Sequence, residues 1–243
     1  MINTILFDLD GTLLRMSQES FINAYFKEIS KVFVRMGMDA ELSIKSIWAG
    51  TKAMLLNDGS MLNSDRFWET FAKSMQLNEE QRSTFETAFD NFYSNEFNSV
   101  KSVAVPCDIA QRLVPAMRAK GYTVVLATNP LFPACAVESR LNWIGLSTDD
   151  FHLVTNYSNS TFCKPNLGYY NEIFSKIRKS PQQCLMVGNN PAEDMCVGEL
   201  GAETYLVTDC LENEAETDIS AFQSGTLAQL EEFLMSFQAI GAS

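Results

Sequence analysis

The hydrophobic positions of this chain follow two patterns that alternate along much of its length. Short apolar runs, bounded by polar residues or glycine, are typical of the buried strands of a parallel sheet. These runs cover residues 4–7, 123–127, 151–154, 184–187 and 204–207. Each run is too short to form a helix that buries one face, so we predict five strands.

Between the later strands, hydrophobic residues recur with helical spacing. The predicted helices cover residues 108–120, 134–141, 167–178 and 191–200, and a last one covers 227–237. Gly121 follows the first of these helices, as is common after a helix, and Pro115 inside it should kink it or cost one hydrogen bond. Strands that alternate with helices predict an α/β fold built on a doubly wound parallel sheet.

Residues 15–100 interrupt this alternation. Their pattern predicts about four amphipathic helices, over residues 21–36, 39–56, 65–75 and 79–97, and nine of the 17 phenylalanines lie in this part of the chain. We interpret these rings as the core of a small helical bundle rather than as an aromatic ligand site. The predicted organisation is therefore an α/β core domain, residues 1–14 and 101–243, with an all-helical domain, residues 15–100, inserted after the first strand.

The composition is that of a globular protein with an acidic surface. The 243 residues are 46% hydrophobic and 20% charged, and the net charge is −12. Such a charge repels nucleic-acid polymers and anionic membranes, which disfavours both as main partners. No uncharged apolar stretch approaches the roughly 20 residues needed to span a bilayer. A small phosphorylated substrate, held by local positive charge, remains compatible with this composition.

The cysteines and the single histidine give little evidence of a metal or nucleophilic site. The six cysteines show no zinc-type spacing, and several lie in apolar segments as packed thiols do. The apolar residues at the N-terminus are accounted for by the first strand rather than by an export signal. These features favour a reducing, cytoplasmic location. We interpret His152, beside an apolar run, as a residue at the edge of the core.

Two carboxylates follow the first predicted strand. Asp8 and Asp10 are separated by one residue and precede Gly11. Two such charges about 4 Å apart repel by roughly 4 kcal/mol at an effective dielectric constant near 20. A fold keeps this pair more readily when a cation, a shared proton or a reaction stabilises it. Asp8, at the carboxyl end of a strand, is a candidate nucleophile for phosphoryl transfer.

Other polar residues follow the carboxyl ends of the other strands, where ligands bind in open parallel sheets. Thr128 and Asn129 follow the second strand, and Lys164 lies in the segment after the third. Asn189 and Asp194 follow the fourth strand. Phosphoryl transfer depends mainly on positioning and on neutralising the phosphoryl oxygens, and this set of residues supplies the groups for both.

These motifs, in this order, resemble those of the haloacid dehalogenase-like superfamily. The match consists of Asp-Leu-Asp-Gly-Thr at 8–12, a threonine after an apolar strand, a Lys-Pro pair, and Gly-Asn-Asn-Pro-Ala-Glu-Asp at 188–194. The motifs extend from residue 8 to residue 194, so the resemblance covers the predicted core domain. The helical insertion resembles the α-helical cap of that family.

The resemblance implies a role for each matching residue. Asp8 would attack phosphorus and form an aspartyl-phosphate, and Asp10 would protonate the leaving oxygen and later deprotonate the hydrolytic water. Thr128 would donate a hydrogen bond to the phosphoryl group, with Asn129 beside it. Lys164 would neutralise charge on the phosphoryl oxygens and on Asp8.

The resemblance also implies Mg²⁺ as the cofactor. The ion would bind the Asp8 carboxylate, the Asp10 main-chain carbonyl and the last motif, through Asn189 and Asp194. The family usually has an acidic residue where this chain has Asn189. Three consequences are open: weaker metal binding, replacement by Glu193, or a protein that binds phosphate compounds and turns them over slowly. Our hypothesis is weaker metal binding with activity retained.

Each of these residues also has a structural interpretation. Asp10 could cap the turn before Gly11, Thr128 could be an ordinary hydroxyl at a strand end, and Lys164 could be a solvated loop lysine. Residues 190–193 match a helix start, with an asparagine cap followed by proline. The four motifs in the right order favour the functional interpretation. For Arg15, a solvated or internally paired side chain is favoured over contact with a substrate anion, and for Cys163 packing is favoured over redox sensitivity.

The leading functional hypothesis is a Mg²⁺-dependent phosphatase of a small phosphorylated metabolite, with the cap closing over the substrate. A dehalogenase of the same family is disfavoured, because that chemistry does not need Asp10 as a proton donor. A phosphosugar mutase and a non-catalytic phosphate-binding protein remain alternatives. The inserted helices carry no motif that identifies the substrate, and the sequence does not predict the oligomeric state.

Overall fold

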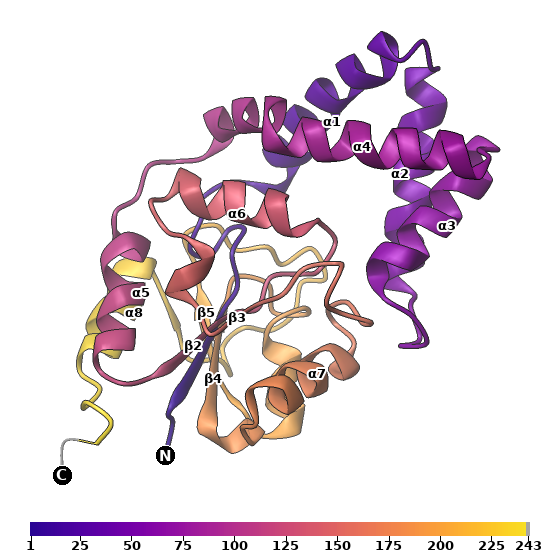
Figure 1. Cartoon of the computed structure of the whole chain (residues 1–243). Coiled ribbons are helices and arrows are strands. Elements are labelled where there is room, and N and C mark those ends of the chain that lie inside the picture. Colours follow the sequence, from indigo (N-terminus) through magenta and orange to yellow (C-terminus); the bar gives the residue numbers. More distant parts are fainter. Residues whose placement is uncertain (242–243) are drawn as a thin grey trace.

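A computed structural model describes residues 1–241, and its centre is a six-stranded parallel sheet in the order β3-β2-β1-β4-β5-β6 (Figure 1). Helices cover both faces of this sheet, so the predicted α/β fold is confirmed. The strands are β1 Thr4–Phe7, β2 Thr123–Leu126, β3 Leu153–Val154, β4 Cys184–Gly188, β5 Glu203–Val207 and β6 Ser224–Gly225.

Strand β1 lies at the centre of the sheet, and all four of its residues are buried. Phe7 is in register with Leu126 of β2 on one side and with Val187 of β4 on the other. The chain first adds β2 and β3 on one side of β1 and then crosses to add β4, β5 and β6 on the other. The end of β1 is therefore a switch point, where open α/β sheets bind their ligands.

The two faces of the sheet are buried by different helices, because successive side chains of a strand point to opposite faces. Ile5 and Phe7 belong to a cluster that includes residues of α5 (Ile109–Ala119) and α8 (Leu227–Met235). Leu6 belongs to a second cluster, with α7 (Leu167–Ile177). The remaining helix after β2 is α6, Ala134–Trp143.

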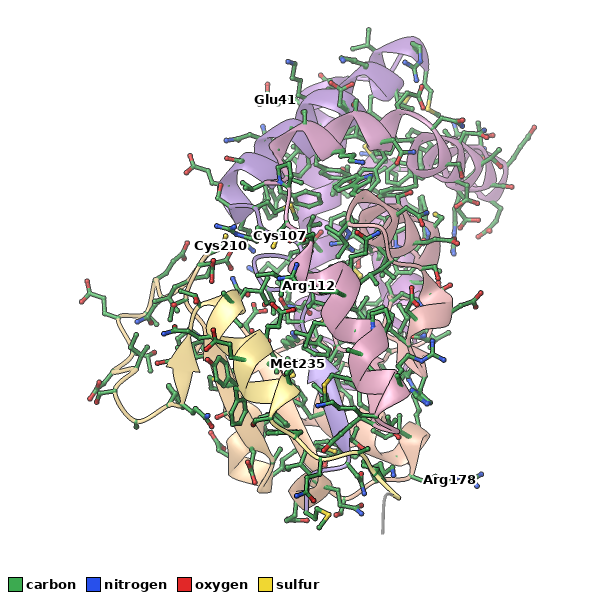
Figure 2. All side chains as sticks on the ribbon, turned by 90° about the vertical axis from the view of Figure 1, so that its left-hand side faces the viewer. Glu41, Cys107, Arg112, Arg178, Cys210 and Met235 are labelled. Carbon is green, nitrogen blue, oxygen red and sulfur yellow. The ribbon has the colours of Figure 1, made fainter. Side chains whose placement is uncertain are left out.

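Helices α5 and α8 lie side by side on one face of the sheet, as Figure 2 shows around Arg112 and Met235. Arg112 of α5 donates a hydrogen bond of 2.7 Å from Nη2 to Glu231 of α8 and also pairs with Asp108. The ion pair ties the C-terminal helix to the helix that precedes β2. Helix α5 continues through Pro115.

Four helices lie between β1 and α5: α1 Gln18–Arg35, α2 Ala40–Leu55, α3 Asn63–Met75 and α4 Glu79–Ser94. We call residues 18–94 the helical insert. Polar caps set several of its boundaries, since Ser17, Asp39 and Asn78 each accept a backbone N–H of the helix that follows. The insert lies beyond the carboxyl ends of the strands (Figure 1). The division of the chain into domains at residues 14 and 100 stays a prediction.

The structure differs from the predicted elements in three places. Residues 191–200 do not form an α-helix: a turn is followed by a 3₁₀ helix, Met195–Leu200. The Asp194 side chain there accepts the backbone N–H of Asn190 and a bond from Lys164, which constrains the turn. The predicted helix 79–97 ends at Ser94 and is followed by a 3₁₀ segment, Glu96–Val103. The two-residue strand β6 was not predicted, because two residues carry no periodicity.

Two further short segments complete the description. The 3₁₀ turns Thr148–Asp150 and Pro181–Gln183 precede β3 and β4. Within residues 1–241, no helix has both the length and the hydrophobicity needed to cross a bilayer.

Candidate active site

Asp8 is the first residue after β1, and both its backbone and its side chain are hydrogen-bonded. Its backbone N–H donates to the Val187 carbonyl at 2.8 Å, which continues the pairing with β4. Thr12 Oγ1 lies 3.0 Å from Asp8 Oδ2 and donates to it. The chain turns sharply between them at Gly11, whose φ is +82° and where an added Cβ would lie 2.1 Å from Asn189 Nδ2. Only glycine fits this turn without displacing a neighbour.

Lys164 lies beneath Asp8 and is only 1% exposed. Its Nζ donates to Asp8 Oδ1 at 2.8 Å and to Asp194 Oδ1 at 2.6 Å. Burial acts to lower the pKa of this ammonium, but the Asp194 and Asp8 carboxylates outweigh it and hold the pKa well above its ordinary value. Lys164 is therefore a charged, buried partner of both carboxylates, and the interpretation as a solvated loop lysine is wrong.

Asp194 reaches Lys164 from the segment after β4. Its Oδ2 accepts the Asn190 N–H at 3.0 Å, so both carboxylate oxygens are hydrogen-bonded. Gly188, the last residue of β4, makes room for this side chain, since a Cβ there would lie 2.1 Å from Asp194 Oδ2. Asn190 Oδ1 accepts the N–H groups of Ala192 and Glu193, as a cap would, but the segment that follows is a turn and not the predicted α-helix.

Asp10 points toward helix α6 and forms an ion pair with Arg140, from Nη1 to Oδ2. Arg140 is 1% exposed, and its Nε donates to the Ala136 carbonyl. Burial raises the pKa of Asp10 above its ordinary value, against the opposing effect of Arg140. This partner was not predicted, because an arginine on an amphipathic helix gives no signal that it is buried.

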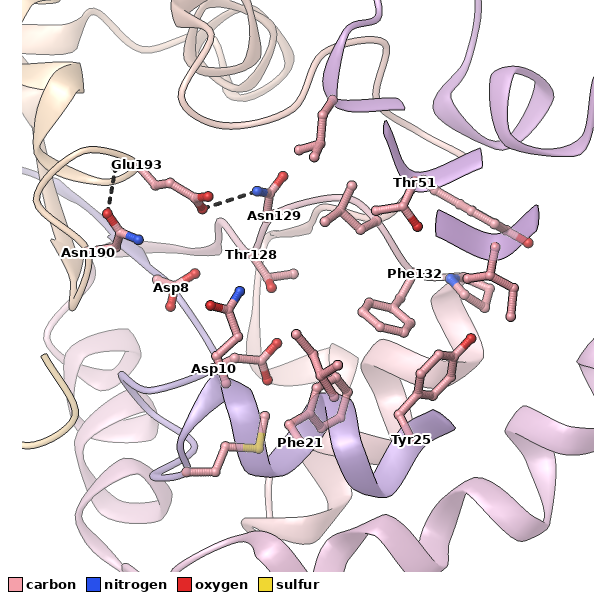
Figure 3. A pocket seen from close by; sticks show the side chains of 18 of the residues that line it. Asp8, Asp10, Phe21, Tyr25, Thr51, Thr128, Asn129, Phe132, Asn190 and Glu193 are labelled. Carbon is pink, nitrogen blue, oxygen red and sulfur yellow. Dashed lines mark hydrogen bonds between the residues drawn. The ribbon is translucent and has the colours of Figure 1, made fainter. Parts of the chain in front are cut away.

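Thr128 and Asn129 follow β2 after one intervening residue and contact several of the other motifs. The Thr128 carbonyl accepts hydrogen bonds from the hydroxyls of Thr155 (2.7 Å) and Tyr169 (2.9 Å). Asn129 Oδ1 accepts the Lys164 backbone N–H at 3.3 Å, and its Nδ2 donates to Glu193 Oε2 at 3.1 Å. Figure 3 shows the Asn129–Glu193 bond at the edge of a cavity, with Thr128 and Asp8 beside it.

Asn189 uses both ends of its amide within the protein. Its Nδ2 donates to the Cys210 carbonyl at 2.7 Å, and its Oδ1 lies 3.0 Å from Thr12 Oγ1. Since Thr12 has a single hydroxyl hydrogen, Asn189 and Asp8 compete for it. The side chain thus fastens the segment around Cys210 to the turn after β1.

Two glutamates add to the negative charge. Glu193 was considered from the sequence as a replacement metal ligand, whereas Glu212 was not identified. Burial, followed by the nearby carboxylates, raises the pKa of Glu212 to about 7, and burial also raises that of Glu193. Glu212 lies shortly after β5, so its place beyond the carboxyl end of that strand is the sequence signal that identifies it as a candidate.

The predicted magnesium ligands are Asp8, the Asp10 carbonyl, Asn189 and Asp194. Within residues 1–241, no three His, Cys, Asp or Glu side chains converge on one metal position. Mg²⁺ nevertheless keeps several waters and is commonly held by one or two carboxylates together with substrate phosphate. The donors here are carboxylate, amide and carbonyl oxygens in a strongly acidic region, and their chemistry fits this hard ion. Asp8 and the Asp10 carbonyl are the donors nearest the end of β1, whereas Asp194 is already committed to Lys164 and Asn190.

A cavity of about 250 Å³ extends from these residues into the helical insert (Figure 3). Six of the seven predicted site residues line it, and Lys164 lies just behind them: Asp8, Asp10, Thr128, Asn129, Asn189 and Asp194. The other end is aromatic and aliphatic. Four of the nine phenylalanines of residues 15–100 line the cavity: Phe21, Phe26, Phe67 and Phe89. Their interpretation as bundle core alone is therefore wrong, although Phe33, Phe71, Phe85, Phe92 and Phe97 are buried.

Three residues that the sequence left open lie outside the cavity lining. Arg15 Nη2 is 3.5 Å from Asp209 Oδ1, so this arginine is paired within the protein. Cys163 is buried, and burial raises the pKa of its thiol to about 12, which fits a packed residue. His152 is exposed rather than at the core edge, and its Nδ1 accepts the Val124 N–H at 3.0 Å.

Comparison with known families agrees with this arrangement. A family model described as a haloacid dehalogenase-like hydrolase matches residues 2–198, and the chain belongs to this family. The match covers the sheet from β1 through β4 and the helical insert. No curated protein sequence matches the chain significantly.

Solved structures share the fold over nearly the whole chain at low sequence identity. A predicted phosphoglycolate phosphatase from Haemophilus somnus is 18% identical with a TM-score of 0.57, covering 96% of this chain and 97% of that one. The Bacillus subtilis protein YfnB, solved bound to magnesium, is 18% identical with a TM-score of 0.59 and coverages of 96% and 99%. A 2-haloacid dehalogenase from Pseudomonas syringae is 16% identical with a TM-score of 0.63 and coverages of 97% and 99%. These similarities establish the fold.

Proposed function

We propose that this protein is a Mg²⁺-dependent phosphatase that hydrolyses a small phosphorylated metabolite through a phosphorylated Asp8. The main support is the buried Lys164 ammonium, bonded to Asp8 at 2.8 Å directly beside the cavity. A fixed cation at this point orients the Asp8 carboxylate and offsets charge on an incoming phosphoryl group. Asp10, two residues away, lines the same cavity.

In the first step, an Asp8 oxygen forms a bond to phosphorus while the bond from phosphorus to the alcohol oxygen breaks. Asp10 gives its proton to that departing oxygen, so a neutral alcohol leaves. In the second step, water attacks phosphorus, Asp10 takes a proton from it, and the bond from Asp8 to phosphorus breaks. Inorganic phosphate and the original carboxylate result.

The neighbouring residues have positioning and electrostatic roles in this proposal. Thr128 supplies a hydroxyl donor at the cavity wall, and Asn129 fixes the Lys164 backbone and Glu193. Asp194 is the second carboxylate that accepts a hydrogen bond from Lys164 Nζ. Mg²⁺, held by Asp8 and the Asp10 carbonyl with Asn189 and Asp194 nearby, would neutralise phosphoryl charge. Residues 15–100 would act as a cap that excludes water from the cavity.

Phosphate release from a panel of phosphomonoesters, with Mg²⁺ and with a chelator, tests the proposal. Asp8→Asn should reduce turnover by about 10³-fold or more, because the amide is a poor nucleophile. Asp218→Asn, at an exposed aspartate outside the cavity, is the matched control and should keep full turnover. A phosphoryl group found by mass spectrometry on the peptide containing Asp8 would support the covalent step. Unchanged turnover in Asp8→Asn would overturn it.

A second candidate is a phosphate-compound-binding protein with little turnover, and Asn189 favours it. Both ends of the amide are committed to protein partners, and a carboxylate is missing from this position. Binding of phosphoesters without phosphate release, at any Mg²⁺ concentration, would favour this candidate. Halide release or phosphoryl return to a sugar would instead identify a dehalogenase or a mutase.

The six free thiols agree with a reducing, cytoplasmic location.

A further inference from the structure

We propose that the alcohol part of the substrate is an uncharged, largely apolar group of about the size of one aromatic ring. This inference rests on the proposed phosphatase function and concerns the part of the cavity formed by the helical insert. That part starts at the rings of Phe21 and Phe132 and extends away from Asp8 and Asp10 (Figure 3). A cavity of about 250 Å³ holds a small organic group together with a phosphoryl group.

The part of the cavity formed by the helical insert, its inner part, is lined mainly by apolar side chains. Its walls are aromatic or aliphatic side chains of α1, α2 and α3 and of the segment after β2, among them Tyr25, Ile47, Trp48, Phe67 and Phe132. The hydroxyls of Tyr25 and Tyr93 are bonded to each other at 2.9 Å. Gln18, Thr51 and Tyr157 are the further polar side chains in this part. A sugar would bring several hydroxyls into this part of the cavity. Many of these hydroxyls would have no hydrogen-bond partner, which costs free energy in a buried site.

The charges that line the cavity disfavour a second anionic group on the substrate. Every charged residue that lines the cavity is a carboxylate: Asp8, Asp10, Glu193, Asp194 and Glu212. Of the residues that the structure describes, no Lys, Arg or His lines it. Arg15 pairs with Asp209, and Arg140 lies behind the wall, where it pairs with Asp10; neither arginine lines the cavity. A second anionic group on the substrate, such as a carboxylate or another phosphate, would be buried without a counter-ion.

The packing of the aromatic rings favours a neutral group over an organic cation. A cation is bound well by aromatic rings when it lies over their faces. Here the rings pack against one another. Tyr25 and Phe132 lie edge to face with their centres 5.6 Å apart, and Phe26 and Trp48 are tilted by 35° with their centres 5.3 Å apart. The carboxylates lie at the phosphoryl end rather than around the inner part, so the inner part presents apolar surface without local negative charge.

The test measures kcat/KM for four esters: phenyl phosphate, phosphoglycolate, glucose 6-phosphate and phosphocholine. We expect phenyl phosphate to exceed each of the others by about 100-fold in kcat/KM and also to bind most tightly to the inactive variant described below. The binding order is needed because phenol leaves more readily than an alkyl alcohol, so turnover alone favours the aryl ester. A preference for phosphoglycolate, the sugar phosphate or phosphocholine would overturn the inference and leave the phosphatase proposal intact. The same four esters are titrated calorimetrically into Asp8→Asn. If no ester is turned over, the phosphatase proposal fails, and the order of affinities still decides the inference.

A pair of variants in α2 and just after it tests the lining directly. Leu55 lines the cavity and is 42% exposed, whereas Leu56 does not line it and is 72% exposed. A lysine at either position can reach solvent, so both proteins should fold, and thermal unfolding checks this. Leu55→Lys should lower kcat/KM for phenyl phosphate about 10-fold and improve the relative use of phosphoglycolate. Leu56→Lys should match the wild type, and an equal effect of both substitutions would overturn the assignment.

Discussion

Arg140 of α6 and Asp10 of the turn after β1 form an ion pair in which only the arginine is fully buried, although 130 residues separate them in the sequence. The guanidinium carbon of Arg140 lies 4.7 Å from the centre of the Phe132 ring, and Phe132 lines the cavity. Among the described residues, Arg140 Nη2 and Asp10 Oδ1 have no hydrogen-bond partner. The pair therefore fixes one oxygen of Asp10 and connects the proposed acid–base group to the aromatic wall.

Replacing Arg140 with methionine should destabilise the protein by about 3 kcal/mol, because it leaves the Asp10 charge without its partner. Asp10 is 32% exposed in its side chain, which places the expected loss at the low end for a buried pair. Urea unfolding measures it. The double variant Arg140→Met, Asp10→Asn should recover most of the loss, since no unpaired carboxylate remains. Additive losses would show that the two side chains do not interact.

Arg140→Met should also affect the proposed reaction through Asp10. We expect a lower kcat with a smaller change in KM, because the Asp10 carboxyl loses its fixed orientation. Steady-state kinetics on a phosphoester that the wild type hydrolyses is the measurement. Arg140→Lys keeps a cation and should restore part of kcat. A purely structural role would instead reduce the amount of folded enzyme and leave kcat per folded molecule unchanged.

Asn189→Asp should lower the Mg²⁺ concentration needed for half-maximal activity by about 10-fold, because a carboxylate adds a charged oxygen near Asp8. The same substitution removes the donor to the Cys210 carbonyl and should cost about 1–3 kcal/mol of stability without metal. Activity against Mg²⁺ concentration and unfolding with a chelator measure the two effects. Asn189→Ser lacks the charge and should not improve metal use. An unchanged Mg²⁺ dependence in Asn189→Asp would contradict the weakened-site hypothesis.

The stability of the metal-free protein should fall with rising pH because of Glu212. Its pKa is raised from 4.5 to about 7, first by burial and then by nearby carboxylates. The folded state thus retains a proton that the unfolded state releases, and stability present below about pH 4.5 is lost as pH rises to about 7. Glu212→Gln removes this effect. The variant should gain about 1–2 kcal/mol relative to wild type between about pH 5 and pH 8, after allowance for partial exposure. Parallel unfolding curves across this range would contradict the prediction.

Gly188→Ala should displace Asp194, because the added Cβ would lie 2.1 Å from its Oδ2. We expect a loss of about 1–3 kcal/mol and a marked loss of activity, since Lys164 would lose one of its two carboxylate partners. Gly198→Ala is the matched control: the nearest atom to its Cβ is 3.8 Å away, and its stability should be nearly unchanged. Thermal unfolding and activity of both variants are compared. Equal behaviour would show that the Asp194 side chain adapts freely.

Cys163 should resist alkylation in the folded protein despite its position beside Lys164. Burial raises the pKa of its thiol to about 12, so almost no reactive thiolate is present near neutral pH. Iodoacetamide treatment followed by peptide mass spectrometry should label Cys163 only after denaturation. The half-buried Cys107 offers an internal comparison. Rapid labelling of Cys163 in the native state would show that the region opens readily.

The strands and the residues at their ends followed from local sequence. The run from Thr4 to Phe7 is apolar at every position because both faces of β1 are covered, and that pattern is visible without a structure. Since parallel strands end at one edge of a sheet, Asp8, Thr128 and Asn189 could be expected there together. The structure places these residues around one cavity, and the roles assigned to them stay predictions.

The sequence by itself determined the class of fold, the family and the residues at the strand ends, because each of these depends on short-range spacing of apolar and polar residues. Only the tertiary structure decided that Arg140 meets Asp10, that Glu212 joins the acidic group, and that Phe21 and Phe67 line a cavity as well as a core. These relationships depend on how distant segments pack. A buried arginine, a crowded carboxylate or a ring beside a cavity has the same local pattern as one on an ordinary amphipathic element.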